Sequence, residues 1–364
     1  MKKRVVSMLL ACAMGLSLAA CGGSSSAPAS TTAAAKAEQP AADANAELTI
    51  DQVWPKGTTV YIDVPAKAGG GTDLYTRYLT QALTEITPDV NFVVNNYDTT
   101  EVGRENMKNA DPDGTHLLVH HAGMFIEYMS GSTNVSAKDD YKTVGIVNMG
   151  GPQAIIARPD APYKNFKELK EYIDANPGDV VVGCTLGGAS QAVLYVLFEA
   201  LGEGTAANVN WVQCGSEADK LTQTASGSID IANCSIPNAL AYEADGKLTI
   251  LGTNGPAVAT LDTMSELVGS ALPENYKSGP EQGYDGAVNE LSYYCWAPKD
   301  TPDNVCKAIN AQIQKATEVQ SFIDGNKQMA TFVGAVSYED AQKTLEHEWQ
   351  VMSDTAEKMG VKTR

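Results

Sequence analysis

Apolar and polar residues alternate along the chain in two rhythms, one typical of short strands and the other of amphipathic helices. In the first unit, strands are expected at 58–64, 90–95 and 115–120, with helices at 72–86 and 101–109. A Gly-Gly-Pro break at 150–152 then interrupts the pattern. The break predicts the start of a second structural unit.

The second unit repeats the alternation of strands and helices. Its strands are expected at 153–157, 180–182, 209–212, 229–232 and 248–252, and its helices at 166–175, 189–201, 217–225 and 237–245. This spacing indicates βαβ units, each with a mostly parallel sheet flanked by helices. The sequence therefore predicts an α/β protein of two lobes, with candidate crossovers at 144–157 and 248–254.

The C-terminal part returns to a helical rhythm. Seven apolar residues recur at spacings of three and four and form one stripe: Tyr338, Ala341, Leu345, Trp349, Met352, Ala356 and Met359. We expect this stripe to pack on the first lobe. Docking on a partner or lying on a membrane surface is the alternative.

The N-terminus has the layout of a signal peptide, predicted for residues 1–20. Three basic residues precede an apolar run that is too short to span a membrane as a stable helix. The stretch Leu-Ala-Ala-Cys that ends at Cys21 resembles a bacterial lipobox, in which the cysteine is lipidated. An ordinary cleaved signal is the alternative.

A tether is expected between this leader and the folded part. Residues 21–47 contain mainly Ser, Ala, Thr and Pro and show no apolar periodicity, so they cannot form a packed core. The remaining chain is predicted to form lobe 1 from residues 48–147 plus 254–364, and lobe 2 from residues 148–253.

Charge narrows the range of partners. The formal net charge is −18, and loss of the basic leader makes the remaining chain more negative. Such a chain is not expected to bind nucleic acid. An anionic ligand would need donors placed close to it, because charges beyond about 8 Å are screened.

Two glycine-containing loops could supply such donors. Gly69, Gly70 and Gly71 follow a strand and lead into Thr72 and Asp73 at a helix start, where free N–H groups favour an anion. The stretch at 183–190 repeats this arrangement in the second lobe. Ligands of open α/β sheets lie beyond the carboxyl ends of the strands, so the two loops could hold one small anion. A structural turn is the alternative for either loop.

Several stretches together resemble the solute-binding proteins of tripartite tricarboxylate transporters, also called the Bug family. They run in family order over nearly all of the folded part: V-P-A-K-A-G-G-G-T-D-L-Y-T-R (64–77), D-P-D-G-T-H-L-L-V (111–119), A-R-P-D-A-P-Y-K-N-F-K-E-L (157–169), A-N-P-G (175–178), S-G-S-I-D-I-A-N-C-S-I-P-N-A-L (226–240), D-G-K-L (245–248) and A-P-K-D-T-P (297–302). The resemblance implies a two-lobed clamshell of the type II periplasmic-binding-protein kind. It also implies binding of a small carboxylate and its delivery to a large and a small membrane subunit.

The resemblance also implies where the ligand lies. The candidate ligand-binding residues are Gly69, Gly70, Gly71, Thr72, Asp73, His121, Ala122, Thr185, Gly187, Gly188, Ala189, Ser190, Cys234 and Ser235. Two stretches depart from the family pattern. Where the family has a proline-and-glycine loop after its second strand, residues 95–103 retain only Gly103. In the second-lobe loop, the small polar residues typical of the family are partly replaced by Cys184, Leu186 and Ala189. The resemblance therefore does not name the ligand.

Cysteine, histidine and arginine leave further alternatives open. Cys184, Cys214 and Cys234 are each expected to end a strand and to point towards the cleft, as apolar fillers, as a disulfide, or as a soft-metal or redox site. Of the pair His120-His121, we expect one ring to be buried and the other to face the cleft. Arginine is scarce, so no arginine clamp on a carboxylate is evident.

No motif for catalysis is present in the sequence. The G-x-S-x-G elbow, the H-E-x-x-H motif and a phosphate-binding loop are all missing, and no cofactor or metal is expected. We therefore predict an exported lipoprotein, anchored through lipid to the outer face of the cell membrane. It is expected to act as a monomeric, non-enzymatic binding protein for a tripartite transporter. A clamshell sensor that docks to a signalling membrane protein is the alternative.

Overall fold

The computed structural model describes residues 46–364, and these residues contain two five-stranded sheets. The predicted signal peptide, Cys21 and nearly all of the predicted tether lie outside the described residues. In the described part of the chain, no helix combines the length and apolar character needed to cross a bilayer.

The first sheet has the strand order β2-β1-β3-β10-β4. Its strands are β1 (Thr59–Val64), β2 (Asn91–Asn96), β3 (His116–His121), β4 (Tyr141–Asn148) and β10 (Tyr293–Pro298). The helices of this part are α1 (Ile50–Val53), α2 (Gly71–Ile86), α3 (Thr100–Lys108), α4 (Gly123–Met129), α5 (Ala137–Asp140), α11 (Asp303–Thr317), α12 (Gln320–Gln328) and α13 (Tyr338–Lys358). We call the sheet and these helices lobe 1.

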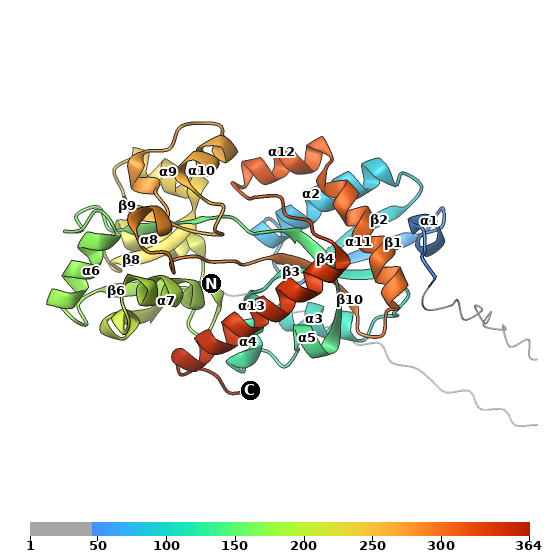
Figure 1. Ribbon diagram of the computed structural model, residues 1–364, viewed down its shortest axis with the longest axis horizontal. Coiled ribbons are helices and arrows are strands. Elements are labelled where there is room, and N and C mark those ends of the chain that lie inside the picture. The colour runs from blue at the N-terminus through green and yellow to red at the C-terminus, as the bar shows by residue number, and fades with distance from the viewer. Residues whose placement is uncertain (1–45) are drawn as a thin grey trace, which may run out of the picture. The chain divides into compact units, whose positions relative to one another are not determined.

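The second sheet has the equivalent order β7-β6-β8-β5-β9. Its strands are β5 (Gln153–Ala157), β6 (Val181–Cys184), β7 (Asn210–Gln213), β8 (Ile231–Ser235) and β9 (Thr249–Asn254). Around it lie α6 (Phe166–Ala175), α7 (Ala189–Leu201), α8 (Glu217–Ala225), α9 (Ile236–Ala244), α10 (Leu261–Val268) and the short 3-10 turns η1 (Thr205–Asn208), η2 (Glu274–Tyr276) and η3 (Pro280–Gln282). This part is called lobe 2, and Figure 1 shows both lobes.

Both sheets are mixed, because each contains one strand that runs against the others. In lobe 1, β10 pairs antiparallel with both β3 and β4, whereas β1 pairs parallel with β2 and β3. In lobe 2, β5 takes the same position between β8 and β9. The predicted two-lobed α/β architecture with mostly parallel sheets is confirmed, and the structure identifies the one reversed strand of each sheet.

Each sheet has an apolar core on both faces. Adjacent residues of β3 divide between the two cores of lobe 1: Val119 packs with α2 and α11, and Leu118 packs with α4 and α13. Two further clusters cover the faces of the second sheet. These layers fix the strand ends from which the loops of the cleft emerge.

The C-terminal stripe packs as predicted. Ala341, Leu345, Met352 and Ala356 of α13 are buried against lobe 1. In Figure 1, α13 runs from the first sheet towards α7 of lobe 2. The hydroxyl of Tyr195 on α7 donates to the carbonyl of Lys358 at the end of α13, at 3.1 Å. The helix therefore belongs to lobe 1 and also contacts lobe 2.

The second predicted lobe boundary needs correction. Residues 254–287 were assigned to lobe 1, but Met264, Leu272 and Tyr276 are buried in the core of lobe 2, and Ala287 joins its other face. This segment returns to lobe 2 because its apolar side chains cover faces of the second sheet. We propose that the crossovers lie at about 149–152 and 288–292.

Candidate functional site

A cleft of about 520 Å³ lies where the loops of both lobes meet. Lobe 1 contributes Pro65, Ala66, Thr72, Thr100, Glu101, Arg104, His120, His121, Glu127 and Ser132, and lobe 2 contributes Thr185, Leu186 and Gly188. The lobe 1 residues follow β1, end β3, or lie in the first two turns of α2 and α3, except for Glu127 within α4 and Ser132 after it. The carboxyl ends of parallel strands are the usual place for a ligand in such sheets.

The first glycine loop is held in place by Asp73. The Asp73 carboxylate accepts hydrogen bonds from the Gly69 N–H at 2.8 Å, from Arg77 Nε at 3.0 Å and from Asn96 Nδ2 at 2.9 Å. Burial alone would raise the pKa of Asp73, but these bonds hold it below its ordinary value. Gly69 has a φ of +82°, which suits glycine. Asp73 therefore holds the loop in place through its bond to the Gly69 N–H.

The second glycine loop is held in the same way, by side chains of α7 and β7. Ser190 Oγ accepts from the Thr185 N–H at 2.8 Å, Gln213 Oε1 from the Leu186 N–H at 2.9 Å, and Gln191 Oε1 from the Gly187 N–H at 2.7 Å. Three amides that the sequence offered to an anion are thus already bonded. These bonds hold the loop in place, and Thr185, Leu186 and Gly188 are its residues that line the cleft.

Ser235 does not line the cleft, and its donors are paired within lobe 2. Its N–H and hydroxyl both donate to Glu217 Oε1, at 3.0 and 2.6 Å, and Asn238 donates to the same oxygen at 2.7 Å. Glu217 therefore places the chain's own carboxylate at the N-terminus of α9. A ligand carboxylate at that helix end would meet a like charge.

Both histidines line the cleft and both are neutral. The Gly123 N–H donates to His121 Nδ1 at 3.0 Å, so the ring proton of neutral His121 is on Nε2. Burial lowers the pKa of His121 to about 4. Burial and the neighbouring His121 hold the pKa of His120 well below its ordinary value. His120 is buried, with 4% of the residue exposed, and His121 is half-buried, so the expected difference in burial is present although both residues line the cleft.

The positively charged residue that lines the cleft is Arg104, which the sequence analysis did not select. Arg104 lies on the buried face of α3, and only 2% of the residue is exposed. Its Nη2 is 2.6 Å from Glu127 Oε2 on α4. The one available signal was its place on the helix: Arg104 and Met107 lie three residues apart on one buried side.

Glu101 completes the set of charges in the cleft. Its two oxygens accept hydrogen bonds from Thr133 Oγ1, at 2.5 Å, and from the Asn134 N–H, at 3.1 Å. Glu101 thereby fixes the loop that follows α4. Among the lining residues, one side chain is positive and two are negative.

The two lobes touch beside the cleft. Ser130 Oγ of lobe 1 donates to the Gly187 carbonyl of lobe 2 at 3.0 Å. A Cβ added to Gly123 would lie 2.5 Å from the His121 ring and 2.7 Å from Ala189 Cβ. Gly123 thus permits a close approach of α4 to the start of α7.

The predicted site residues divide into two groups. Four of them line the cleft: Thr72, His121, Thr185 and Gly188. The others lie outside its lining: Gly69, Gly70, Gly71, Asp73, Ala122, Gly187, Ala189, Ser190, Cys234 and Ser235. Most of this second group flank the cleft and position its loops.

The three cysteines of lobe 2 pack in its core. Cys184, Cys214 and Cys234 are free thiols, each buried to within 2%. They do not line the cleft, contrary to the expected orientation. Burial raises the pKa of the Cys184 thiol to about 12. Among residues 46–364, no group of three or more His, Cys, Asp or Glu side chains is arranged to hold a metal ion.

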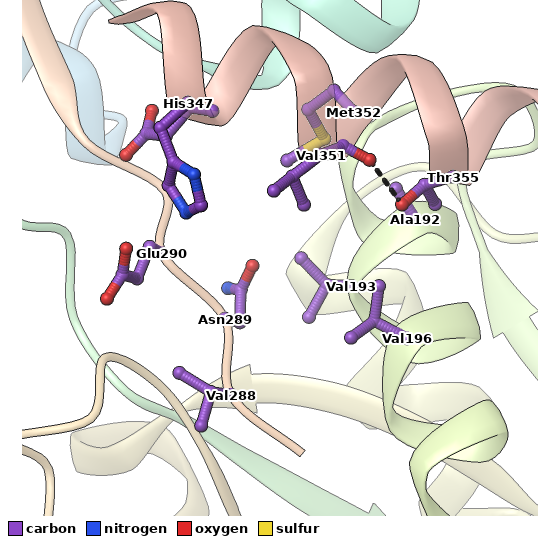
Figure 2. A pocket seen from close by; sticks show the side chains of 11 residues that line it. Ala192, Val193, Val196, Val288, Asn289, Glu290, His347, Val351, Met352 and Thr355 are labelled. Atoms are coloured by element: carbon purple, nitrogen blue, oxygen red, sulfur yellow. Dashed lines mark hydrogen bonds between the residues drawn. The ribbon is translucent and has the colours of Figure 1, made fainter. Parts of the chain in front are cut away.

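A second cavity, of about 240 Å³, lies between α7 and α13 beside the second crossover. Figure 2 shows Val193 and Val196 of α7 across from Val351 and Met352 of α13, with His347 and Glu290 at the other end. Its lining is mainly apolar, whereas polar groups of both lobes converge in the larger cleft. The larger cleft is therefore the candidate ligand site.

A profile of the tripartite tricarboxylate transporter receptor family, TctC, matches residues 91–360. The chain belongs to this family. A UPF0065 protein from the TAR-I ttuE-ttuC′ intergenic region of Agrobacterium vitis is 26% identical over 262 residues, covering 71% of this chain and 70% of that protein. Another UPF0065 protein, from Bordetella pertussis, is 24% identical over 264 residues, covering 72% of this chain and 77% of its own length. The resemblance to the Bug family is thereby confirmed.

Several solved structures share the fold of this chain. The periplasmic binding protein BugD has a TM-score of 0.65 at 24% identity, covering 84% of this chain and 99% of its own. MatC from Rhodopseudomonas palustris, solved with malate, has a TM-score of 0.63 at 19% identity, covering 82% and 99%. An R. palustris protein solved with adipate has a TM-score of 0.66 at 19% identity, covering 84% and 98%. These three structures support the two-lobed clamshell architecture.

Proposed function

We propose that this TctC-family chain is an extracytoplasmic solute-binding protein that captures a small carboxylate in the cleft between its lobes. The observation that carries the proposal is the buried guanidinium of Arg104 in a cleft lined by both lobes. Arginine is the side chain best suited to a carboxylate, because its planar donors match the two oxygens. Malate and adipate in the two R. palustris structures support the same ligand class.

Delivery of the ligand to a membrane transporter follows from the family. We propose that the closed, loaded protein docks on the large and small membrane subunits of a tripartite transporter. Capture by a hinged clamshell needs only a few residues at the crossovers to change conformation. The two short segments at 149–152 and 288–292 connect the lobes in this protein and are suited to that motion.

The proposal is tested by measuring thermal unfolding of the purified protein with small carboxylates and with their primary amides as matched controls. A ligand at 100 times its Kd adds about 2.7 kcal/mol, which raises the midpoint of a domain of this size by about 4 °C. We expect at least one acid to do so while its amide does not. The proposal fails if no acid shifts the midpoint and denatured protein releases no bound carboxylate detectable by mass spectrometry.

Transport is tested separately from binding. Cells that carry the gene should accumulate the radiolabelled ligand, and cells that lack it should not. Binding without any effect on uptake would contradict the transport role and favour the clamshell sensor.

We also propose that the protein is a monomer anchored to the outer face of the cell membrane by lipid on Cys21. The sequence around Cys21 supports this anchor, and stable anchoring requires more than one acyl chain. The test is incorporation of labelled palmitate by the natural protein and by a Cys21→Ser variant. Equal labelling of the two proteins would refute the anchor.

A further inference from the structure

Arg104 has donors that the protein does not use. Its Nη2 is paired with Glu127, but its Nε is buried without a hydrogen-bond partner. Among the described residues, no hydrogen bond involves Nη1 either. A buried donor without a partner is costly, so these N–H groups favour an acceptor that enters from the cleft.

Neutral donors lie around the same position. His121 carries its ring proton on Nε2, because Nδ1 accepts from the Gly123 N–H. Thr72 and Thr100 line the cleft in the first turns of α2 and α3, where backbone N–H groups have no partner within the helix. One carboxylate could therefore be bound by Arg104 together with these neutral groups.

A second carboxylate on the ligand has no such position. Arg104 is the only positive side chain among the described residues that line this cleft, and Glu127 already pairs with it. Glu101 adds another negative charge on the same side of the cleft. In a partly desolvated cleft, a dianion would place its second charge near two carboxylates without a compensating cation.

Glu127 offers the complementary acceptor. Its Oε2 is bonded to Arg104, and no residue of the described chain donates to its Oε1. About a quarter of the Glu127 side chain, 27%, is exposed. An ammonium group has three donors and a positive charge, so it could bind at Oε1 and also reduce the repulsion from Glu101.

We propose that the cleft selects a small zwitterion, an amino carboxylate whose carboxylate binds Arg104 and whose ammonium group binds Glu127. The proposal rests on the proposed function and names its ligand class. Arg104 and Glu127 act as binding residues, and the pair presents one charge of each sign to the ligand. The zwitterion adds no net charge to a cleft and a chain that are already negative.

The first experiment compares ligands by calorimetry on the full-length protein. The probes are the twenty common L-amino acids and a five-carbon series: L-norvaline and 5-aminopentanoate as zwitterions, pentanoate as the monoanion and glutarate as the dianion. We expect one amino carboxylate to bind at least tenfold more tightly than its deaminated and dicarboxylate counterparts. Tighter binding of a mono- or dicarboxylate overturns this inference but leaves the proposed function intact. If no carboxylate binds at all, both fail.

The second experiment uses Glu127→Gln, with Glu346→Gln as the matched control. Glu346 lies on α13 and pairs with Lys138 at the surface. Loss of the Glu127 charge should weaken the amino carboxylate at least tenfold and strengthen the deaminated analogue, because Arg104 then has no competing carboxylate. The control should change neither affinity.

A purely structural role for Glu127 predicts a different result. In that case both analogues would weaken together in Glu127→Gln, and the selectivity between them would stay constant. Arg104→Gln gives a further check: it should abolish binding of both analogues while the unfolding midpoint shows whether the variant is folded. Retained affinity in folded Arg104→Gln would overturn the assignment of the carboxylate to Arg104.

Discussion

Glu348 on α13 is a buried carboxyl group whose ionisation opposes folding. It accepts hydrogen bonds from Ser292 Oγ at 2.6 Å, from the Ser292 N–H at 3.3 Å and from the Tyr294 hydroxyl at 3.0 Å. Burial raises its pKa to about 7 despite these three donors. The site joins α13 to the start of β10, directly after the second crossover.

The shift determines how stability depends on pH. Unfolded Glu348 releases its proton near its ordinary pKa of 4.5, and folded Glu348 keeps it up to about 7. Between these values the folded state binds more protons, so the free energy of unfolding falls as pH rises. A difference of about 2.5 pKa units corresponds to about 3 kcal/mol, which is the stability lost by pH 8.

The Glu348→Gln variant isolates this effect. Glutamine can accept from Ser292 and cannot ionise, so its stability relative to the natural protein should rise by about 3 kcal/mol between pH 4.5 and pH 8. Any constant loss from the changed hydrogen bonds cancels in that comparison. The assay is urea unfolding at five pH values, followed by tryptophan fluorescence, since Trp349 packs on Phe125 beside the site.

A comparison with a variant is necessary because His121 acts in the opposite direction. Its folded pKa of about 4 lies below its ordinary value of 6.5, so its contribution to stability is lost as pH falls through that range. The two groups partly cancel in the natural protein. Exposed Glu346→Gln serves as the control and should show a difference of less than about 0.5 kcal/mol. A Glu348→Gln difference that is constant or falls with pH would refute a raised pKa.

Three further predictions concern the cleft and the cores. Gly123→Ala should weaken ligand binding at least tenfold in calorimetry, because its Cβ would press on Ala189 across the lobes; unchanged affinity would count against this contact. Asp73→Asn should lower the free energy of unfolding by about 1–2 kcal/mol at pH 7. This deficit should shrink as pH falls below about 4, since Asp73 stabilises only when ionised; a deficit independent of pH would contradict the role of its charge. Cys184, with its raised pKa, should resist iodoacetamide at pH 8 in the native protein and react in urea, as read by peptide mass spectrometry; labelling of the native protein would show that its burial is incomplete.

Much of the fold could be predicted because it depends on local patterns. The strands and helices of both units follow from periodicities of two and about 3.6 residues, and the stripe on α13 packs where expected. Several elements escaped this reasoning, among them α4, β4 and β10. The strand β10 is apolar throughout because it is buried on both faces, so it shows no alternation, and its antiparallel place between β3 and β4 depends on pairing with distant residues.

The site could be predicted in part for a similar reason. The glycine loops mark strand ends, and strand ends of a parallel sheet meet at one edge, so Thr72, Thr185 and Gly188 were expected near the cleft that they line. Which amides remain free could not be predicted. That depends on side chains such as Asp73 and Gln213, which fold back on the loops and take up their donors.

The sequence by itself determined two α/β units, a helix that covers the first of them, the loops at the cleft and membership of a receptor family. The tertiary structure alone decided which charges meet in the cleft. Arg104, Glu127 and His121 lie on three different segments of lobe 1, and no local pattern relates them. Their meeting depends on how α3 and α4 pack against the sheet, because that packing buries the guanidinium at the lining of the cleft and leaves its Nε without a hydrogen-bond partner.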